Sequence, residues 1–260
     1  MREHSKERLC FEEVEKSTIK TEAMVKAVIF TDFDGTVTWQ DSNDYLTDTL
    51  GFGKEERLKV FEGVLDGTKS FRDGFWAMLE SIKTPFPECI EILEEKIQLD
   101  PGFKDTFKWA QENGVPIVVI SSGMKPIIKA LLSKMLGPDS VNKIDIISNE
   151  VEVDAHGQWK IVYRDDSPHG HDKSKSIEAY KKKFEAEGGK PVYFYCGDGV
   201  SDLSAAKECD LLFAKRGKDL VTFCKRQQVP FHEFDTFEDI LASMKQVMNG
   251  EKTVKELMEN

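Results

Sequence analysis

The sequence predicts an α/β fold, a doubly wound parallel sheet core with a small all-helical cap domain and a β-hairpin addition. Three observations lead to this prediction. Short apolar runs alternate with amphipathic helical stretches along most of the chain, the pattern of a parallel sheet covered on both faces. Residues 43–99 interrupt the alternation with helical patterns and no strand. Residues 151–163 read as an antiparallel hairpin that turns at 154–157.

The expected strands are short and rich in β-branched residues, which is typical of strands buried on both faces. Their ranges are 27–31, 115–120, 143–148, 191–196 and 210–214. Helical patterns cover 101–114, 125–138, 201–208, 218–227 and 236–248. In the first of these, Asp100 can cap the helix, Pro101 suits its first position and Asn113-Gly114 ends it. We therefore expect a Rossmann-like core formed by residues 26–42 and 100–250, followed by a tail at 251–260.

The insert at 43–99 is expected to form the cap. Its apolar residues recur at helical spacing, as in Phe71, Phe75 and Met78, and this spacing is typical of the core of a helix bundle. We expect the same role for the apolar residues of the preceding stretch, which are Leu58, Phe61, Val64 and Leu65. A helical insert directly after the first strand indicates a lid.

Composition and charge exclude several partners. The 260 residues include 40% hydrophobic residues, enough for a sizeable core, and 36 basic against 47 acidic residues give a net charge of −11. This charge argues against nucleic acid or an anionic membrane surface as a partner. The longest apolar runs are about six residues, far below the roughly 20 that a membrane-spanning helix needs.

Cysteine usage and the N-terminus indicate the compartment. The five cysteines are widely spaced without a CxxC pair, so neither a zinc site nor a disulfide framework is predicted. Residues 1–25 form a polar arm without the apolar segment of a signal peptide. We expect a cytoplasmic protein, with the nucleus also open, and assign the arm no chemistry.

Acidic side chains follow two of the expected strands. Asp32 and Asp34 come directly after the first strand in DFDGT, and Asp198 and Asp202 follow the strand at 191–196 in GDGVSD. Ligands of open α/β sheets bind at the carboxyl ends of the strands. Carboxylates gathered there repel one another unless a cation lies among them. Mg²⁺ is the cation expected, because it takes few carboxylates and retains water.

Hydroxyl, amide and ammonium donors are expected at the same edge. Ser121, Ser122 and Gly123 follow the strand at 115–120, and HGHDKSKSI places Lys173 and Lys175 before a helix. Together with the acids, these groups could hold a small anion beside a metal ion. The alternative, that DFDGT and GDGVSD are only helix-capping turns, does not account for the serine and lysine between them.

These motifs resemble those of the haloacid dehalogenase superfamily of phosphatases. DFDGT, the SSG after an apolar strand, a lysine before a helix and GDGVSD match its four motifs, and residues 27–249 fit throughout. More narrowly, the chain resembles the phosphoserine-phosphatase-like group, which inserts a small helical cap after the first motif, and it is similar to uncharacterised fungal phosphatases.

The resemblance implies a role for each matching residue. Asp32 would be the nucleophile that forms an aspartyl-phosphate, and Asp34 the general acid and base. Asp32, the main-chain carbonyl of Asp34 and Asp198 would hold Mg²⁺. Lys173 would neutralise the charge shared by nucleophile and phosphate, while Lys175 stays the alternative for the lysine.

The remaining motif residues would serve the phosphate and the turn. Ser121 would hold a phosphoryl oxygen, and Ser122 and Gly123 would offer backbone N–H groups. Asp202 would contact a metal-bound water or orient Lys173, and Gly35 permits the tight turn.

Substrate contacts beyond the phosphate are expected near the joint between core and cap. Asp41, Ser42 and Asn43 lie where the first motif leads into the cap. His169 and His171 are expected near the mouth of the site, although ordinary loop residues are the alternative. Arg72 could reach a substrate carboxylate or phosphate from the cap, or form a surface ion pair instead.

The predicted function is Mg²⁺-dependent hydrolysis of a small phosphorylated metabolite through an aspartyl-phosphate. A phosphotransferase or mutase on the same scaffold and a non-catalytic regulatory module are the alternatives. Phosphoserine, phosphocholine, glycerol phosphate, pyridoxal phosphate and a methylthio-sugar phosphate all stay open as substrates, and the sequence does not predict the oligomeric state.

Overall fold

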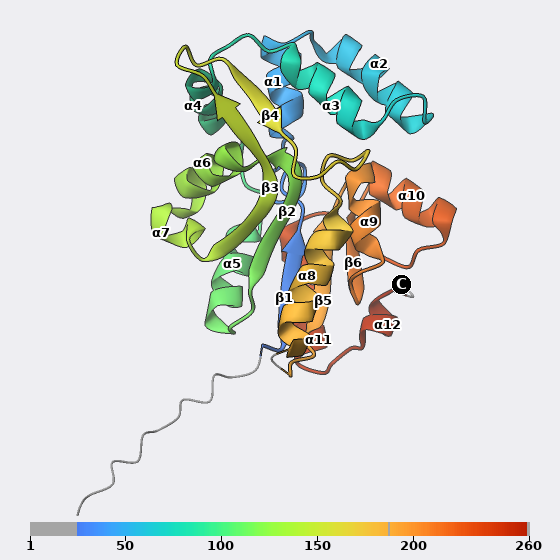
Figure 1. The fold of residues 1–260 in the computed structure, drawn as a ribbon. Helices are drawn as coiled ribbons and strands as arrows, with labels where there is room; N and C mark the ends of the chain where they lie inside the picture. Colours follow the sequence, from blue (N-terminus) through green and yellow to red (C-terminus); the bar gives the residue numbers. More distant parts are fainter. Residues whose placement is uncertain (1–24, 187, 259–260) are drawn as a thin grey trace, which may run out of the picture.

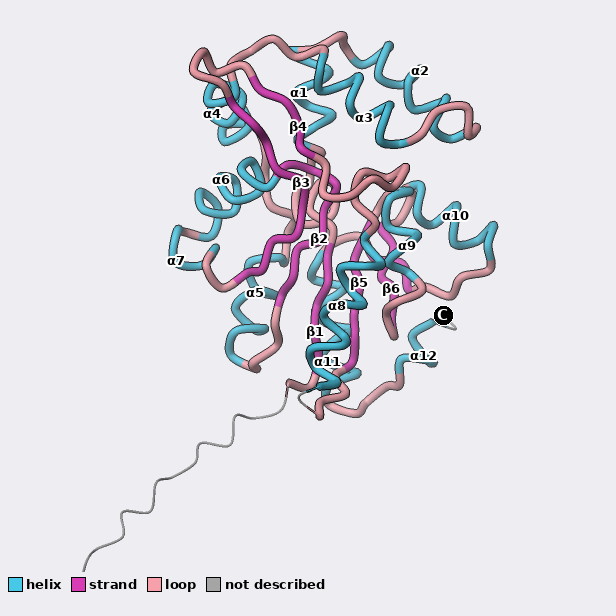
Figure 2. The backbone as a smooth tube through the Cα atoms, viewed as in Figure 1, coloured by secondary structure: helices cyan, strands magenta, loops and turns pink. Residues whose placement is uncertain are grey.

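A single mixed sheet organises the protein. The computed structural model describes residues 25–258 except residue 187, so nearly all of the expected N-terminal arm lies outside the described residues. Within them, one seven-stranded sheet has the order β4-β3-β2-β1-β5-β6-β7 (Figures 1 and 2). Its strands are β1 (Ala27–Thr31), β2 (Ile117–Met124), β3 (Ile144–Val153), β4 (Trp159–Val162), β5 (Val192–Gly197), β6 (Leu211–Lys215) and β7 (His232–Phe234). Neighbouring strands run parallel except β3 and β4, and the predicted fold class is confirmed.

Helices cover both faces of this sheet because successive strand residues point to opposite sides. Ile29 of β1 packs in one core cluster with α5 (Phe103–Glu112), α6 (Lys125–Leu136) and α11 (Phe237–Met248). Phe30, the next residue, packs in a second cluster. That cluster contains residues of α8 (Lys173–Ala186), α9 (Leu203–Ala206) and α10 (Asp219–Gln227). The short α7 (Pro138–Val141) and η1 (Val200–Asp202) complete the core.

The insert after β1 is helical, as the sequence predicts. It contains α1 (Ser42–Leu50), α2 (Lys54–Leu65), α3 (Phe71–Glu80) and α4 (Phe86–Lys96), at the top of Figure 1. The two segments that connect it to the core pair through the isolated bridge Thr38–Leu99. The β3–β4 hairpin also reaches the cap, where the indole N–H of Trp159 donates to the carbonyl of Thr84 at 3.0 Å. The cap therefore contacts the core beyond the two segments that connect them.

Several features differ from the sequence expectation. Helix α5 begins at Phe103 with Gly102, not Asp100, as its N-cap, because the carboxylate of Asp100 pairs with Lys215 and accepts from the backbone N–H of Phe237. The strand at 143–148 and the first arm of the hairpin are one continuous strand, β3. Strand β7 was not predicted, because three residues carry too little pattern. The tail contains the short helix α12 (Val254–Met258), whose Leu257 is buried in the core. No helix among the described residues has the length and apolar character to cross a membrane.

Candidate active site

The first two predicted acids lie in a tight turn at the carboxyl end of β1. The carboxylate of Asp32 accepts from the backbone N–H of Phe33 at 2.7 Å, and both Asp32 and Asp34 are more than 90% buried. Gly35 adopts φ +72°, a conformation that favours glycine. A Cβ on Gly35 would lie 2.5 Å from Oδ2 of Asp198. The turn therefore brings the end of β1 against the end of β5.

A buried lysine joins two of the acids. Nζ of Lys173 lies 2.7 Å from Oδ2 of Asp32 and 2.6 Å from Oδ1 of Asp202, and its side chain is fully buried. Lys175, by contrast, is exposed and lies near Asp172 instead. The geometry thus places Lys173, rather than Lys175, beside the acid after the first strand.

Asp202 has hydrogen-bond donors on both carboxylate oxygens. Oδ1 accepts from the hydroxyl of Tyr195 at 2.6 Å as well as from Lys173. Oδ2 accepts from the backbone N–H groups of Asp198 and Gly199, each at 2.9 Å. Because its oxygens are all engaged in this way, Asp202 acts as a brace for the lysine and for the loop after β5.

Asp198 is the least compensated of these acids. Its carboxylate is 3.4 Å from the hydroxyl of Thr36 and 3.9 Å from Nζ of Lys218. One carboxylate oxygen from each of Asp32, Asp198 and Asp202 lies within 4.8 Å of the others. Burial, with repulsion from Asp202 and Asp32, raises the pKa of Asp198 well above its usual value. Burial and Asp202 likewise raise the pKa of Asp32 to about 7. Two carboxylates placed as closely as those of Asp32 and Asp198 favour a bound cation.

Asp34 accepts hydrogen bonds from the start of the cap. Its Oδ1 accepts from the backbone N–H of Ser42 at 2.8 Å, and its Oδ2 from the side-chain amide of Asn43 at 2.9 Å. Asp41 caps α1 by accepting from the N–H groups of Asn43 and Asp44. Burial, followed by the charge of Asp41, raises the pKa of Asp34 well above its usual value. The raised pKa favours the protonated form of Asp34, the form that a proton donor needs.

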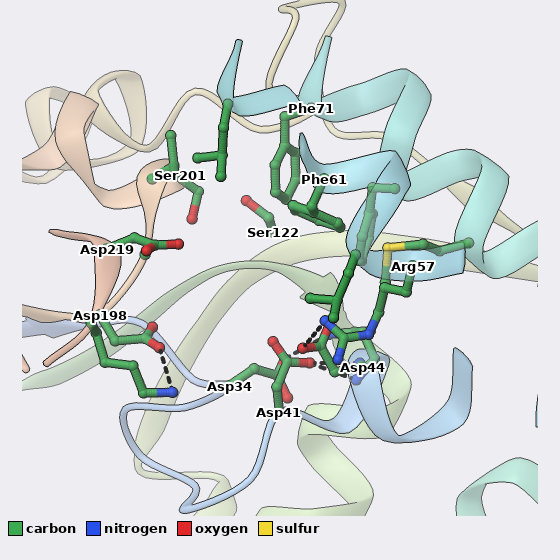
Figure 3. A pocket seen from close by; sticks show the side chains of 18 of the residues that line it. Asp34, Asp41, Asp44, Arg57, Phe61, Phe71, Ser122, Asp198, Ser201 and Asp219 are labelled. Atoms are coloured by element: carbon green, nitrogen blue, oxygen red, sulfur yellow. Dashed lines mark hydrogen bonds and ion pairs between the residues drawn. The ribbon is translucent and has the colours of Figure 1, made fainter. Parts of the chain in front are cut away.

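Ser121, Ser122 and Gly123, here called the serine loop, lie close to the acids. They belong to β2, which extends beyond the predicted end at 120, but they leave its pairing with β3. The backbone N–H of Gly123 donates to the hydroxyl of Ser121 at 2.9 Å. The hydroxyl of Ser122 is buried, has no hydrogen-bond partner, and lines the central cavity (Figure 3). A Cβ on Gly123 would lie 2.8 Å from Oδ2 of Asp34. The loop is thus close to the acids and presents an unused hydroxyl.

A cavity of about 770 Å³ lies between the cap and these loops. Its floor contains Asp32, Asp34, Ser121, Ser122, Gly123 and Asp198, and its cap side contains Asp44, Glu55, Arg57, Leu58, Phe61, Leu65, Phe71, Phe75 and Met78. Figure 3 shows Phe61 and Phe71 of the cap on the side opposite Asp34 and Asp198. The cavity therefore has an acidic floor and a partly aromatic roof.

The expectation for α2 was wrong. No residue of α2 is buried, and Leu58 and Leu65 are more than half exposed. Leu58 and Leu65 line the cavity instead of packing in a bundle core. Phe61 also lines the cavity, but its ring packs edge-on against Phe71 of α3. The spacing predicts which residues share one helix face, but it does not tell whether that face meets a neighbouring helix or an open cavity.

Arg72 and the two histidines do not line the cavity. The guanidinium of Arg72 donates to the carbonyl of Asp165 at 2.7 Å and lies over the ring of Tyr163, in a separate depression beside β4. His171 is buried behind the serine loop. His169 is half-buried, and its Nδ1 has no hydrogen-bond partner. None of these three residues lines the cavity, and their substrate contacts stay predictions.

Other residues of the site were not predicted from the sequence. Arg57 binds Asp44 at 2.7 Å and Asp48 at 2.7 and 2.9 Å beside the cavity. The side-chain amide of Asn149 donates to the carbonyl of Ser122, and the hydroxyl of Tyr195 donates to Asp202. None of them belongs to a recognisable motif, because their roles depend on tertiary contacts between distant segments.

The sheet order, the cap insertion and the placement of the acids put the chain among α/β enzymes that hydrolyse phosphate esters. The chain belongs to the haloacid dehalogenase-like hydrolase family, whose model matches residues 29–207. The resemblance that the motifs indicate is thereby confirmed, and the chain is a phosphatase of this family.

Comparisons with individual proteins agree. The chain is 80% identical over 241 residues to the polyol phosphate phosphatase PYP1 of Saccharomyces cerevisiae, covering 91% of this chain and 100% of that protein. It is 48% identical to Pdp3-interacting factor 1 of Schizosaccharomyces pombe, covering 82% of this chain and 92% of that one. A substrate-bound phosphoserine phosphatase structure has a TM-score of 0.57 at 21% identity, covering 76% of this chain and 90% of that chain.

Proposed function

We propose that the protein is a Mg²⁺-dependent phosphatase that hydrolyses a polyol phosphate through an aspartyl-phosphate on Asp32. One observation carries the proposal. The carboxylate of Asp32 faces the cavity between core and cap beside a buried ammonium group, 2.7 Å from Lys173, and next to a second acid, Asp34, with a raised pKa. A nucleophile and a separate proton donor are the two groups that a two-step phosphoryl transfer needs.

The chemistry proceeds in two displacements. In the first, a carboxylate oxygen of Asp32 forms a bond to phosphorus, and the bond from phosphorus to the substrate alcohol breaks. Protonated Asp34 gives its proton to the departing alkoxide oxygen, so that the alcohol leaves neutral. In the second, Asp34 takes a proton from water, whose oxygen bonds to phosphorus while the bond to Asp32 breaks. Phosphate leaves, and both acids return to their starting states.

Lys173 would neutralise the charge that develops between Asp32 and the phosphoryl oxygens. Its two carboxylate partners hold the ammonium group in place. The unpartnered hydroxyl of Ser122 and the hydroxyl of Ser121 stand ready to donate to phosphoryl oxygens. Ser121, Ser122 and Lys173 are themselves buried, and electrostatic stabilisation is stronger at buried positions than in bulk water.

The acids fit a magnesium site. Asp32 and Asp198 have carboxylate oxygens within 4.8 Å of each other. Burial, followed by the charges of neighbouring aspartates, raises the pKa of each, although Lys173 offsets part of this for Asp32. Asp32, Asp198 and the main-chain carbonyl of Asp34 would hold the ion, and these hard oxygen ligands are the type that Mg²⁺ takes. The oxygens of Asp202 already accept four hydrogen bonds, so we leave Asp202 outside the ligand set. The bound ion would offset negative charge on the phosphoryl group.

The substrate class is supported by similarity and by the charge of the cavity wall. The relative that is 80% identical is a polyol phosphate phosphatase. The tail of a substrate would meet Asp41, Asp44 and Glu62, while the guanidinium of Arg57 is already paired with two aspartates. A neutral polyol can donate hydrogen bonds to such acids, whereas a carboxylate tail is repelled.

The test compares phosphate release from glycerol phosphate, phosphoserine and phosphocholine. The proposal expects the polyol ester to have the highest kcat/KM and phosphoserine the lowest, and preferential hydrolysis of phosphoserine or phosphocholine would overturn the substrate class. Asp32→Asn should abolish turnover without loss of folding, because an amide oxygen is a poor nucleophile. An excess of acceptor alcohol tests the phosphotransferase alternative, which expects phosphoryl transfer in place of phosphate release.

The compartment is also part of the proposal. The described cysteines are free, and three of the four are buried. We retain the cytoplasm as the expected location, with the nucleus open.

A further inference from the structure

The serine loop leaves the hydrogen-bond ladder of the sheet. Strand β2 pairs with β3 in register as far as Ile120, and pairing resumes only at Met124, opposite Asn149. The register shift takes Ser121, Ser122 and Gly123 out of the ladder, as a bulge does where a strand re-aims its residues. Their buried carbonyl groups then need other donors.

His171 supplies one of these donors. Its Nδ1 lies 2.8 Å from the carbonyl oxygen of Ser121, and its Nε2 lies 3.0 Å from the hydroxyl of Ser176. Because a carbonyl can only accept, Nδ1 carries the proton, and Nε2 accepts from the serine hydroxyl. The side chain is 1% exposed, and burial lowers the pKa of His171 to about 4. The ring is therefore a neutral donor with one defined orientation.

Asn149 supplies the other. Its side-chain N–H donates to the carbonyl oxygen of Ser122 at 2.7 Å. Its side-chain oxygen accepts from the backbone N–H of Arg164 at 2.8 Å. Asn149 is fully buried, and because both ends of the amide are engaged its orientation is fixed as well.

We propose that His171 and Asn149 are positioning residues that hold two successive peptide planes of the serine loop, so that the loop presents its N–H groups to a phosphoryl group. This inference rests on the proposed function of the same site. In a trans peptide the carbonyl and the N–H point in opposite directions, and the described chain has no cis peptide. Because His171 holds the carbonyl of Ser121 on one side of the peptide plane, the N–H of Ser122 points to the opposite side. The carbonyl of Ser122 fixes the N–H of Gly123 in the same manner.

Two observations place these donors on the cavity side. Ser121, Ser122 and Gly123 line the cavity, whereas His171 and Asn149 do not. The N–H of Gly123 already donates to the hydroxyl of Ser121 at 2.9 Å, so it points toward a group that the mechanism assigns to phosphate. Donors fixed before the substrate arrives need no reorganisation during the reaction, which is the main source of electrostatic catalysis.

The experiment compares His171→Leu, which has no donor, with His171→Asn, whose amide N–H falls near the position of Nδ1. Ser176→Ala is the matched control, because it removes the partner of Nε2 but keeps the bond to Ser121. Three quantities are measured on the Mg²⁺-loaded full chain: the Kd for inorganic phosphate by calorimetry, kcat, and the Tm. A merely structural role would change only the last of these.

The proposal expects His171→Leu to lose about 10- to 100-fold in kcat and to bind phosphate more weakly. His171→Asn should recover most of both, and Ser176→Ala should stay within about threefold of wild type. A folded His171→Leu protein with unchanged phosphate affinity and kcat, and only a lower Tm, would overturn the proposal. If that variant does not fold, Asn149→Ala decides by the same criteria, because it removes the donor to the carbonyl of Ser122.

The phosphate measurement also separates this inference from the proposed function. If the wild-type chain hydrolyses no polyol phosphate but His171→Leu or Asn149→Ala binds phosphate more weakly than wild type, the positioning role is supported and the proposed substrate class is overturned. Full activity of His171→Leu and Asn149→Ala on a polyol phosphate would support the proposed function and overturn the positioning role.

Discussion

Gly35→Ala offers a test of the contact between the first motif and the proposed metal site. Gly35 has φ +72°, and a Cβ at this position would lie 2.5 Å from Oδ2 of Asp198. The substitution therefore has two effects. It strains the backbone, and it forces the carboxylate of Asp198 away from the place where we expect a magnesium ligand.

The two effects have different magnitudes. An alanine with positive φ costs about 1 kcal/mol. Atoms rarely approach a Cβ closer than 3.0 Å, so Asp198 must retreat from 2.5 Å to at least that distance. A displacement of about 1 Å at a reacting centre can reduce the rate by about 100-fold. We expect kcat to fall by about 10-fold or more, and the Mg²⁺ concentration for half-maximal activity to rise.

Gly114→Ala is the matched control, because Gly114 has φ +63° and open space where a Cβ would lie. Both variants should lose a similar free energy of unfolding from strain in urea denaturation, with any further loss in Gly35→Ala due to the crowded carboxylate. Only Gly35→Ala should change the Mg²⁺ titration of phosphate release. Equal activity and equal Mg²⁺ dependence in the two variants would refute the role assigned to Asp198.

Three further predictions concern the lysine, its brace and the histidine. Lys173→Met should abolish phosphate release, whereas Lys175→Ala, at an exposed position, should keep activity within about twofold; the reverse result would transfer the role to Lys175. Asp202→Asn should destabilise the fold by about 3 kcal/mol in urea denaturation and lower kcat, because it breaks a fully buried ion pair; an unchanged free energy of unfolding would contradict the brace. The pKa of His171 is lowered to about 4 in the folded protein. Between about pH 4 and 6.5 the unfolded chain therefore binds a proton at His171 that the folded protein does not. The contribution of His171 to the free energy of unfolding is thus complete above about pH 6.5 and is lost as the pH falls toward 4. Comparing the free energy of unfolding of wild type and His171→Asn at about pH 5 and pH 7 checks this, and the same pH slope in both would show that His171 does not contribute.

Much of the site could be predicted because strand ends fix its position. Once residues 27–31 and 191–196 are recognised as neighbouring parallel strands, Asp32 and Asp198 must meet at one sheet edge. The structure pairs β1 with β5 directly. Gly35 could also be predicted, because the tight turn after β1 needs a positive φ that glycine adopts without strain.

The residues that were missed act through contacts between distant segments. Asn149 lies in β3 beyond the end of the predicted strand, 27 positions from the carbonyl that it holds. His171 was expected at the cavity mouth, but its ring turns inward to the serine loop. The apolar face of α2 was assigned to a bundle core because periodicity does not distinguish a neighbouring helix from an open cavity.

The proposed mechanism requires a phosphoryl group bound covalently to Asp32, and acid quenching of the enzyme during turnover can trap it. The protein is mixed with glycerol phosphate and Mg²⁺, quenched within the first turnover and digested, and its peptides are analysed by mass spectrometry. We expect a single added phosphoryl group on the peptide that contains Asp32, absent from Asp32→Asn and removed by longer incubation before the quench. Phosphate release without any phosphoryl group on Asp32, or with one on another residue, would disprove the mechanism.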